Sequence, residues 1–389
     1  MTAALTAGVV AAGYVGKMPP ALPLFQEELG LSLIAVSWLV SMFNLIGLSA
    51  ALPFGLSADR LGAFRFCVVG LVVLAAGGLA GSAAESAAWM LASRVLEGAG
   101  FIAVAVSAPA LLVAASAPAR RSLTLGLWSA YLPFGVCVAL ALSPLALATL
   151  GWRGWWAVLA AAALACVAAL AALRRHYAGL HRTQARTFTD LRRALGQPVP
   201  WLYGSAFAAY TVSFYGVLVW LPTYVQQTQD AGLAQGSLLA AAMMLANVGG
   251  NLYGTRLAQR GVPRGRIMTA AFLLGGLIAV GIYAPGGAPA ARYACALLFN
   301  LVVGVIPAAV MSGVPRYAGS AAEVATLQGV VVQLSNVGIF GGPPLVAAAV
   351  TWGGGWEAAS VVLLAAAAAG AALSLWLARF ERRALPAAA

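Results

Sequence analysis

Gly55-Leu-Ser-Ala-Asp59-Arg60-Leu-Gly62-Ala-Phe-Arg65 decides the fold, because a partial copy of it returns 199 residues later. The copy is Gly254-Thr-Arg-Leu-Ala-Gln-Arg260-Gly261-Val-Pro-Arg264, in which two glycines and the last arginine keep their places. The same offset maps Leu22-Pro23 onto Leu221-Pro222. Two halves of equal length, each with a basic turn after its second apolar segment, indicate a duplicated bundle of membrane helices. This architecture is typical of secondary transporters.

The composition predicts an all-α membrane protein. The chain is 62% hydrophobic and 8% charged, whereas soluble domains carry about 25% charged residues. A helical span needs about 20 apolar residues, and strand-length alternation is absent, so helices satisfy the backbone. We predict twelve spans, at residues 3–25, 34–55, 64–84, 87–113, 122–146, 154–173, 200–222, 236–254, 266–284, 291–313, 322–349 and 357–378.

The net charge of +12 could suggest a nucleic-acid partner, but the positions of the charges exclude one. With a cytoplasmic N-terminus, eighteen of the 22 basic residues fall in cytoplasmic turns or tails, and only Arg153 and Arg292 face outside. This distribution follows the positive-inside rule. We therefore expect a multi-pass protein of the bacterial inner membrane, with the lipid bilayer as its partner and both termini cytoplasmic. The first span lacks a basic leader region and a cleavage site, so we expect it to be retained.

The sequence divides into two six-helix halves, residues 1–173 and 199–379, with a cytoplasmic linker at 174–198 and a cytoplasmic tail at 380–389. Within the linker, residues 187–195 have the pattern of a short amphipathic helix at the membrane surface. Both histidines also lie in the linker, without a cysteine or carboxylate cluster, and all four cysteines lie in apolar segments. We therefore expect no metal and no cofactor.

Two motifs resemble those of one known family. Gly55-x3-Asp59-Arg60-x-Gly62-x2-Arg65, between the second and third spans, resembles the loop signature of the major facilitator superfamily. Arg94-Val-Leu-Glu97-Gly98-Ala-Gly100 resembles its second motif, with Glu97 in place of the usual glutamine. The resemblance implies two pseudo-symmetric six-helix halves around a central cavity, and transport by alternating access.

Three fragments are similar to the cyanate/nitroimidazole permease-like branch of this superfamily. They are Trp220-Leu-Pro222, Gly126-Leu-Trp128 and Gly151-Trp-Arg153. The Gly-Pro-x-x-Gly-Gly pattern that marks drug/proton antiporters is absent from the fifth span, which has Leu132-Pro133-Phe-Gly135 instead. This absence counts against a drug exporter without excluding one.

The loop signature predicts a conformational latch at the cytoplasmic face. Asp59 can meet the N-terminus of the eleventh span, where the helix dipole favours an anion, and neighbouring arginines would add contacts. Breaking and remaking such contacts supports switching between inward-open and outward-open states. The predicted latch residues are Gly55, Asp59, Arg60, Gly62 and Arg65.

Lys17 is the first of two basic residues inside predicted spans. A charge in the hydrocarbon region costs about 2.5–3.5 kcal/mol on insertion scales. Lys17 lies eight residues before the outer end of its span, about 12 Å of helix rise, so we expect it to face a watery cavity or a partner. The alternative is a helix that starts later and leaves Lys17 at an interface. Pro19 and Pro20 also free backbone carbonyls just before Lys17, as in the broken helices of transporter sites.

Arg94 and Glu97 lie three residues apart on one helix face, so they can pair with each other or share a partner. One interpretation is an ion pair that fixes the packing between spans one and four. The functional one makes Glu97 the proton-coupling site and Arg94 the group that keeps it ionised until a proton or an anionic substrate competes. The planar donor fork of Arg94 also suits carboxylate recognition.

Polar and aromatic residues in other spans suggest a mixed apolar and hydrogen-bonding pocket, although each alone is also a plausible packing residue. The predicted substrate-binding residues are Lys17, Tyr14, Asn44, Arg94, Trp128, Tyr131, Tyr210, Tyr215, Asn247, Gln333 and Asn336.

These observations predict a secondary active transporter, acting as a monomer on a small anionic or polar organic solute, with protons as the candidate coupling ion. The alternative is a proton antiporter that exports hydrophobic drugs or metabolites. A third class, a sensor built on the same bundle, would call for a signalling domain. The sequence has no Walker-type Gly-Lys-Ser/Thr loop, which excludes ATP as the energy source. The spans contain no nucleophile–histidine pair, which argues against an enzyme.

Overall fold

The computed structural model describes residues 1–50, 54, 61–117, 121, 124, 127–128, 130–177, 196–229, 232–317 and 321–384. All regular structure in these ranges is helical, which confirms the predicted all-α class. The described chain forms two compact units. Unit 1 combines Met1–Ala185 with Leu221–Ala241, and unit 2 combines Arg186–Trp220 with Ala242–Ala389.

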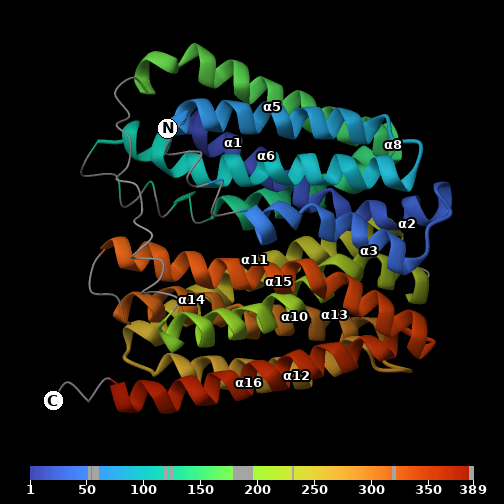
Figure 1. Cartoon of the computed structure of the whole chain (residues 1–389). Helices are drawn as coiled ribbons and strands as arrows, with labels where there is room; N and C mark the ends of the chain where they lie inside the picture. Colours follow the sequence, from blue (N-terminus) through green and yellow to red (C-terminus); the bar gives the residue numbers. More distant parts are fainter. Residues whose placement is uncertain are drawn as a thin grey trace. The chain divides into compact units, whose positions relative to one another are not determined.

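Unit 1 is built on the helices of the first half of the sequence (Figure 1). They are α1 Thr2–Gly16, α2 Met18–Glu28, α3 Leu33–Met42, α5 Ala63–Ser82, α6 Ala87–Ala114, α8 Tyr131–Ala172 and the 3-10 turn η2 Arg174–Tyr177. Helix α5 packs along α6, and α1 packs along α8. The α5–α6 contact is close because Gly100 has no side chain: a Cβ there would lie 2.5 Å from the backbone nitrogen of Leu74. Small residues at such contacts are how membrane helices approach closely.

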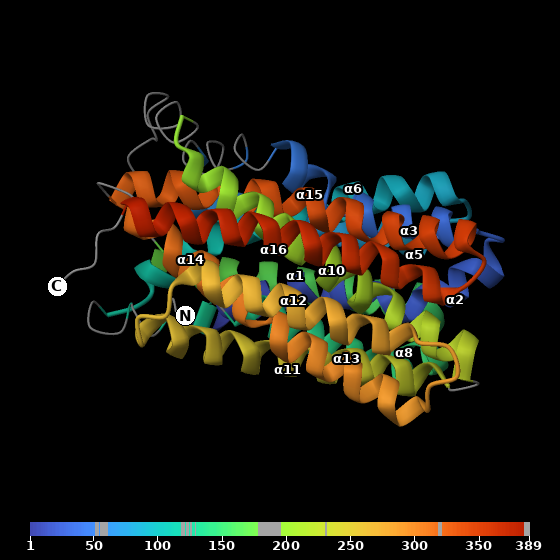
Figure 2. The same ribbon diagram turned by 90° about the horizontal axis from the view of Figure 1, so that it is seen from below.

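Unit 2 contains most of the remaining helices, and α10 and α11 each cross from one unit to the other. Helix α12 packs against α13, α14 and α16 (Figure 2). The elements are α10 Pro198–Gln229, α11 Leu233–Gln259, α12 Arg264–Tyr283, α13 Pro289–Val303, α14 Val305–Gly313, η3 Val314–Tyr317, α15 Ala321–Gly353, η4 Trp356–Ala358 and α16 Ala359–Ala384.

The twelve predicted spans can be identified in the described residues. Nine stretches there are long and apolar enough to cross a membrane. One of them, α8, comprises two predicted spans, because Gly151 inside it has a non-helical φ of 64°. Two further predicted spans are divided, one between α1 and α2 at Lys17 and the other between α3 and helical residues 45–50.

The sequence repeat is also present in the backbone. Gly62 has φ 84° and Gly261 has φ 81°, a left-handed region that favours glycine. Each lies just before a helix of 20 residues, α5 and α12 respectively. The second repeated feature, the Leu-Pro pair, places Pro23 inside α2 and Pro222 inside α10. The two halves therefore share local geometry as well as sequence.

The predicted domain boundaries stay a prediction. Most of the linker at 174–198 lies outside the described residues, including the expected amphipathic helix at 187–195. The described part begins with the 3-10 turn η2 directly after α8. The compact units also differ from the predicted halves, because Leu221–Ala241 groups with unit 1.

We predict that Gly98→Ala destabilises the protein. A Cβ at position 98 on α6 would collide with the backbone carbonyl of Phe43, and overpacking of this kind costs about 1–3 kcal/mol. Gly341→Ala is the matched control, because a Cβ at this position on α15 meets no atom within 4 Å. Thermal unfolding in one detergent should show a lower midpoint for Gly98→Ala only. Equal midpoints for the two variants would contradict the close α3–α6 contact.

Candidate functional site

The candidate site in unit 1 begins at the break in the first span. Helix α1 ends at Gly16 and α2 begins at Met18, with Pro19 in its first turn, so Lys17 is the residue between the two helices. Its backbone keeps a near-helical φ of −65°, and its amide donates to the carbonyl of Gly13 at 2.9 Å. The two helices therefore follow each other directly, with no loop between them. The side chain of Lys17 is fully buried.

Glu97 on α6 bonds to two cations at once. The Lys17 ammonium donates to Glu97 Oε1 at 2.7 Å, and neither side chain is exposed. Arg94 Nη1 donates to the other oxygen, Glu97 Oε2. One carboxylate thus joins the break between α1 and α2 to α6, and the three side chains together carry a formal charge of +1. We call Lys17, Arg94 and Glu97 the buried trio.

Arg94 has further partners on α3 and α1. Its Nε donates to the carbonyl oxygen of Leu39 at 3.0 Å, and its Nη1 lies 3.3 Å from the carbonyl oxygen of Tyr14. The guanidinium carbon lies 4.5 Å from the centre of the Phe43 ring. The arginine therefore ties α1, α3 and α6 together, with its donors directed at oxygen atoms and its face against an aromatic ring.

Two aromatic rings flank the Lys17 ammonium. Lys17 Nζ lies 4.1 Å from the centre of the Tyr14 ring and 4.0 Å from that of the Trp156 ring. Both distances are within the range of cation–π attraction. The Tyr14 hydroxyl and Trp156 Nε1 are buried and have no hydrogen-bond partner among the described residues.

Trp156 was not among the residues predicted from the sequence. Its available signal was a tryptophan four residues after Trp152 on a helix that restarts at Gly151, a spacing that puts both rings on one face. In the structure they are joined by Phe25, which makes edge contacts with both, at 5.0 Å and 5.6 Å between ring centres. Trp152 Nε1 also donates to Glu28 Oε2 at 2.7 Å, near the exposed end of α2. This aromatic layer separates the buried trio from that end.

The structure tests two predictions about the partners of buried charged side chains. Lys17 was expected to face a cavity or a partner, and Glu97 is its partner. The predicted pairing of Arg94 with Glu97 is confirmed. Their predicted roles in substrate binding and proton coupling stay predictions.

The other predicted site residues of unit 1 lie outside the trio. Trp128 and Tyr131 stack at 3.9 Å between ring centres, and both rings pack where α1 has Gly8. Asn44 lies in the turn after α3, where its side-chain amide donates to the carbonyl of Val40 at 3.4 Å.

In unit 2, the structure brings Tyr210 and Asn247 together. The side-chain amide of Asn247 on α11 donates to the Tyr210 hydroxyl on α10 at 3.2 Å, and to the carbonyl of Asn300 on α13 at 3.3 Å. Asn300 Oδ1 is buried without a hydrogen-bond partner among the described residues. Phe207 and Phe214 stack on either side of Tyr210, each with 5.5 Å between ring centres.

The other predicted site residues of unit 2 are Tyr215, Gln333 and Asn336. Tyr215 meets this aromatic row through an edge contact with Phe214. Gln333 and Asn336 lie on α15, and Asn336 is buried. Nearby, one of the hydrogen bonds between α10 and α15 runs from the Thr211 hydroxyl to the carbonyl of Ser335, at 2.8 Å.

Of the predicted latch, only Gly62 and Arg65 belong to the described residues; Arg65 is exposed in the first turn of α5. Gly55, Asp59 and Arg60 lie outside them. No group of three or more metal-ligating side chains gathers in the described part of the chain.

Comparisons with known proteins extend these findings. The family model described as Major Facilitator Superfamily matches residues 4–343. Among curated proteins, the methyl viologen resistance protein SmvA of Salmonella typhimurium is 30% identical over 114 residues, which are 28% of this chain and 22% of that protein. The methylenomycin A resistance protein of Streptomyces coelicolor is 31% identical over 154 residues, 39% of this chain and 32% of that protein. The puromycin resistance protein pur8 of Streptomyces alboniger is 30% identical over 134 residues, 34% and 27% of the two chains.

The matched stretches thus amount to only 22% to 32% of the length of these relatives. The fold is matched far more completely. Crystal structures of a bacterial homologue of the human lysosomal transporter Spinster align with TM-scores of 0.80 and 0.82, at 14% and 13% identity. The first alignment covers 97% of this chain and 96% of the other. The family match over residues 4–343 shows that the chain belongs to the Major Facilitator Superfamily.

Proposed function

We propose that the chain is a secondary active transporter that exports hydrophobic organic compounds in exchange for protons. The observation that carries this proposal is the state of Lys17. Its ammonium is fully buried, bonded to Glu97 and flanked by two aromatic rings. An ammonium that is fully buried and paired in this way does not meet an anionic solute unless the pair first separates.

The charge of the buried trio suggests how protons enter the mechanism. Two cations share one carboxylate, so the three groups carry +1 together. A proton added to Glu97 would leave two cations facing each other away from water, which is costly. Proton uptake therefore has to accompany a movement that parts Lys17 from Glu97, and the helix break at Lys17 is a natural place for such movement. Coupling between protonation and conformational change follows from that requirement.

The relatives also favour export. Three of them are named for resistance to methyl viologen, methylenomycin A and puromycin. Their matches cover only part of each protein, so they support the outward direction of transport and not one substrate.

An anionic or polar organic solute is the second candidate. The observation that favours it is the excess positive charge of the trio, together with the donor fork of Arg94. In this version the solute would take the place of Glu97 beside Lys17. The substrate roles of Trp128, Tyr131, Tyr210 and Asn247, the latch at 55–65, the cytoplasmic termini and the monomeric state belong to both versions of the proposal.

We predict that Glu97→Gln destabilises the protein more than Lys17→Met. Glu97→Gln leaves two buried cations without a counter-charge, a loss of about 3–5 kcal/mol. Lys17→Met leaves the Arg94–Glu97 pair, which is neutral. Thermal unfolding in detergent should rank wild type above Lys17→Met, and Lys17→Met above Glu97→Gln. The double variant should be more stable than Glu97→Gln alone, because it removes one of the unpaired cations. Equal losses in the two single variants would refute this charge balance.

We also predict that transport moves protons and substrate in opposite directions and depends on Glu97. In proteoliposomes with an internal pH-sensitive dye, a panel of cationic, neutral and anionic solutes should reveal a substrate-driven proton flux for hydrophobic cations or neutral compounds. Glu97→Gln should abolish this flux. Glu28→Gln is the matched control, because Glu28 is an exposed acid in the same unit, and it should keep the flux.

Coupled flux in Glu97→Gln vesicles would exclude Glu97 as the coupling site. A response to anions alone that Lys17→Ala abolishes would instead support the second candidate.

A further inference from the structure

One end of unit 2 holds a buried carboxylate whose two oxygens are both used. This is the end where α10 and α12 begin and where α11 and α16 end. Glu381, near the end of α16, is 7% exposed. The Tyr203 hydroxyl of α10 donates to its Oε1 at 2.8 Å, and the amide of Gly265 donates to its Oε2 at 3.2 Å. Glu381 therefore caps the N-terminus of α12, where the helix dipole favours an anion.

The arginine next to this cap has an unused donor. Arg264 is the first residue of α12. Its Nε is buried and has no hydrogen-bond partner among the described residues, and the same is true of the hydroxyl of Tyr317. The Tyr317 ring packs on Phe380 at 6.2 Å, which directly precedes Glu381, and Arg264 directly precedes Gly265, whose amide donates to Glu381. A buried cation donor and a buried hydroxyl, neither with a partner, thus lie in one corner of the unit.

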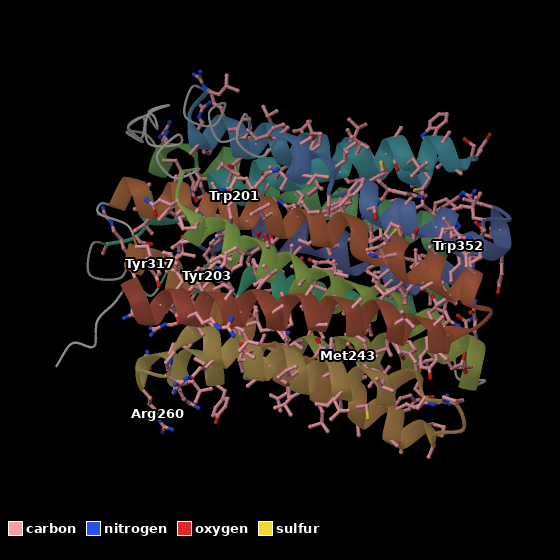
Figure 3. All side chains as sticks on the ribbon, turned by 60° about the horizontal axis from the view of Figure 1, so that its bottom comes forward. Trp201, Tyr203, Met243, Arg260, Tyr317 and Trp352 are labelled. Atoms are coloured by element: carbon pink, nitrogen blue, oxygen red, sulfur yellow. The ribbon has the colours of Figure 1, made fainter. Side chains whose placement is uncertain are left out.

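More arginines surround this corner. Figure 3 shows Tyr203 and Tyr317 at the same end of the unit, with Arg260 also at that end. Among the side chains described there, Glu381 is the one acid, and no arginine of the end has an ion pair within the described residues. The exposed arginines at this end are Arg256, Arg260, Arg266, Arg316 and Arg379.

The surface beside these arginines is apolar and aromatic. Trp376, three residues before Arg379 on α16, is 60% exposed, and Tyr253, three residues before Arg256 on α11, is 54% exposed. Exposed tryptophan and tyrosine beside basic residues are typical of the level of lipid headgroups. A ligand for this corner therefore has an anionic group for the arginines and an apolar part for the helix surface.

We propose that this end of unit 2 binds the headgroup of an anionic phospholipid, with its phosphate between Arg264 and Tyr317. The phosphate accepts from Arg264 Nε and from the Tyr317 hydroxyl, which gives both buried donors a partner. The exposed arginines supply attraction at longer range. Basic clusters between spans at the cytoplasmic side are suited to such lipids, and the positive-inside rule predicts that this end is cytoplasmic. The site is independent of the exported substrate and of the buried trio.

The test is a lipid titration of the purified full chain in a neutral detergent, read by thermal unfolding. Phosphatidylglycerol should raise the unfolding midpoint more than phosphatidylcholine, which carries no net charge. Arg264→Lys keeps the charge but loses the Nε donor, and Tyr317→Phe removes a single hydroxyl. Each should weaken the apparent affinity for phosphatidylglycerol by about fivefold, the value of one hydrogen bond. Arg260→Lys is the matched control for an exposed arginine and should leave the affinity unchanged.

Three results would overturn the proposal. The first is equal stabilisation by phosphatidylglycerol and phosphatidylcholine. The second is an equal loss of affinity in Arg264→Lys and Arg260→Lys, which would mean that only the general charge of this end matters. The third is the full shift with inorganic phosphate alone, which would make the corner a site for free phosphate. Tyr317→Phe keeps the test decisive if Arg264→Lys does not fold.

Discussion

The carboxylate of Glu97 holds two cations inside an apolar bundle, and the arrangement of unit 1 depends on that bond pair. Lys17 sits at the break between α1 and α2, Glu97 lies on α6, and Arg94 reaches carbonyl oxygens on α1 and α3. Three separate helical elements are thereby joined at one point. A charge in such a place persists only where its partners are fixed. Any movement of the first span must therefore break, or carry along, this set of bonds.

Unit 2 has no equivalent ionic centre among its described residues. In its interior, the helices are joined by hydrogen bonds between neutral groups, from the Asn247 amide to the Tyr210 hydroxyl and to the Asn300 carbonyl. Two phenylalanines stack on Tyr210. The buried acid of this unit, Glu381, lies at one end, where it caps α12. The two halves thus share the backbone geometry of the repeat, as Gly62 and Gly261 show, but their buried polar interactions differ. Among the described residues, the buried ion pairs lie in the first half, and the interior hydrogen bonds named in the second half join neutral side chains.

The fold could be predicted from the sequence because its determinants are local. Apolar segments of span length, the basic turns and the repeated glycines each act within a few residues. The Arg94–Glu97 pair was predictable for the same reason, since the two lie one turn apart on one helix. The partner of Lys17 was not predictable, because Glu97 is 80 residues away and only helix packing decides which residues meet. Trp156 and the cap formed by Glu381 were missed on the same grounds: both depend on contacts between distant helices, and neither has a motif.

The most direct measurement of the central claim is the charge state of Glu97 in the folded protein. Infrared spectra of wild type and Glu97→Gln, recorded in lipid at neutral pH, differ chiefly by this one side chain. The difference spectrum should contain the bands of an ionised carboxylate, because Glu97 is the counter-charge for both Lys17 and Arg94. A protonated carboxylic-acid band in its place would contradict the account, since Lys17 and Arg94 would then have no anion between them.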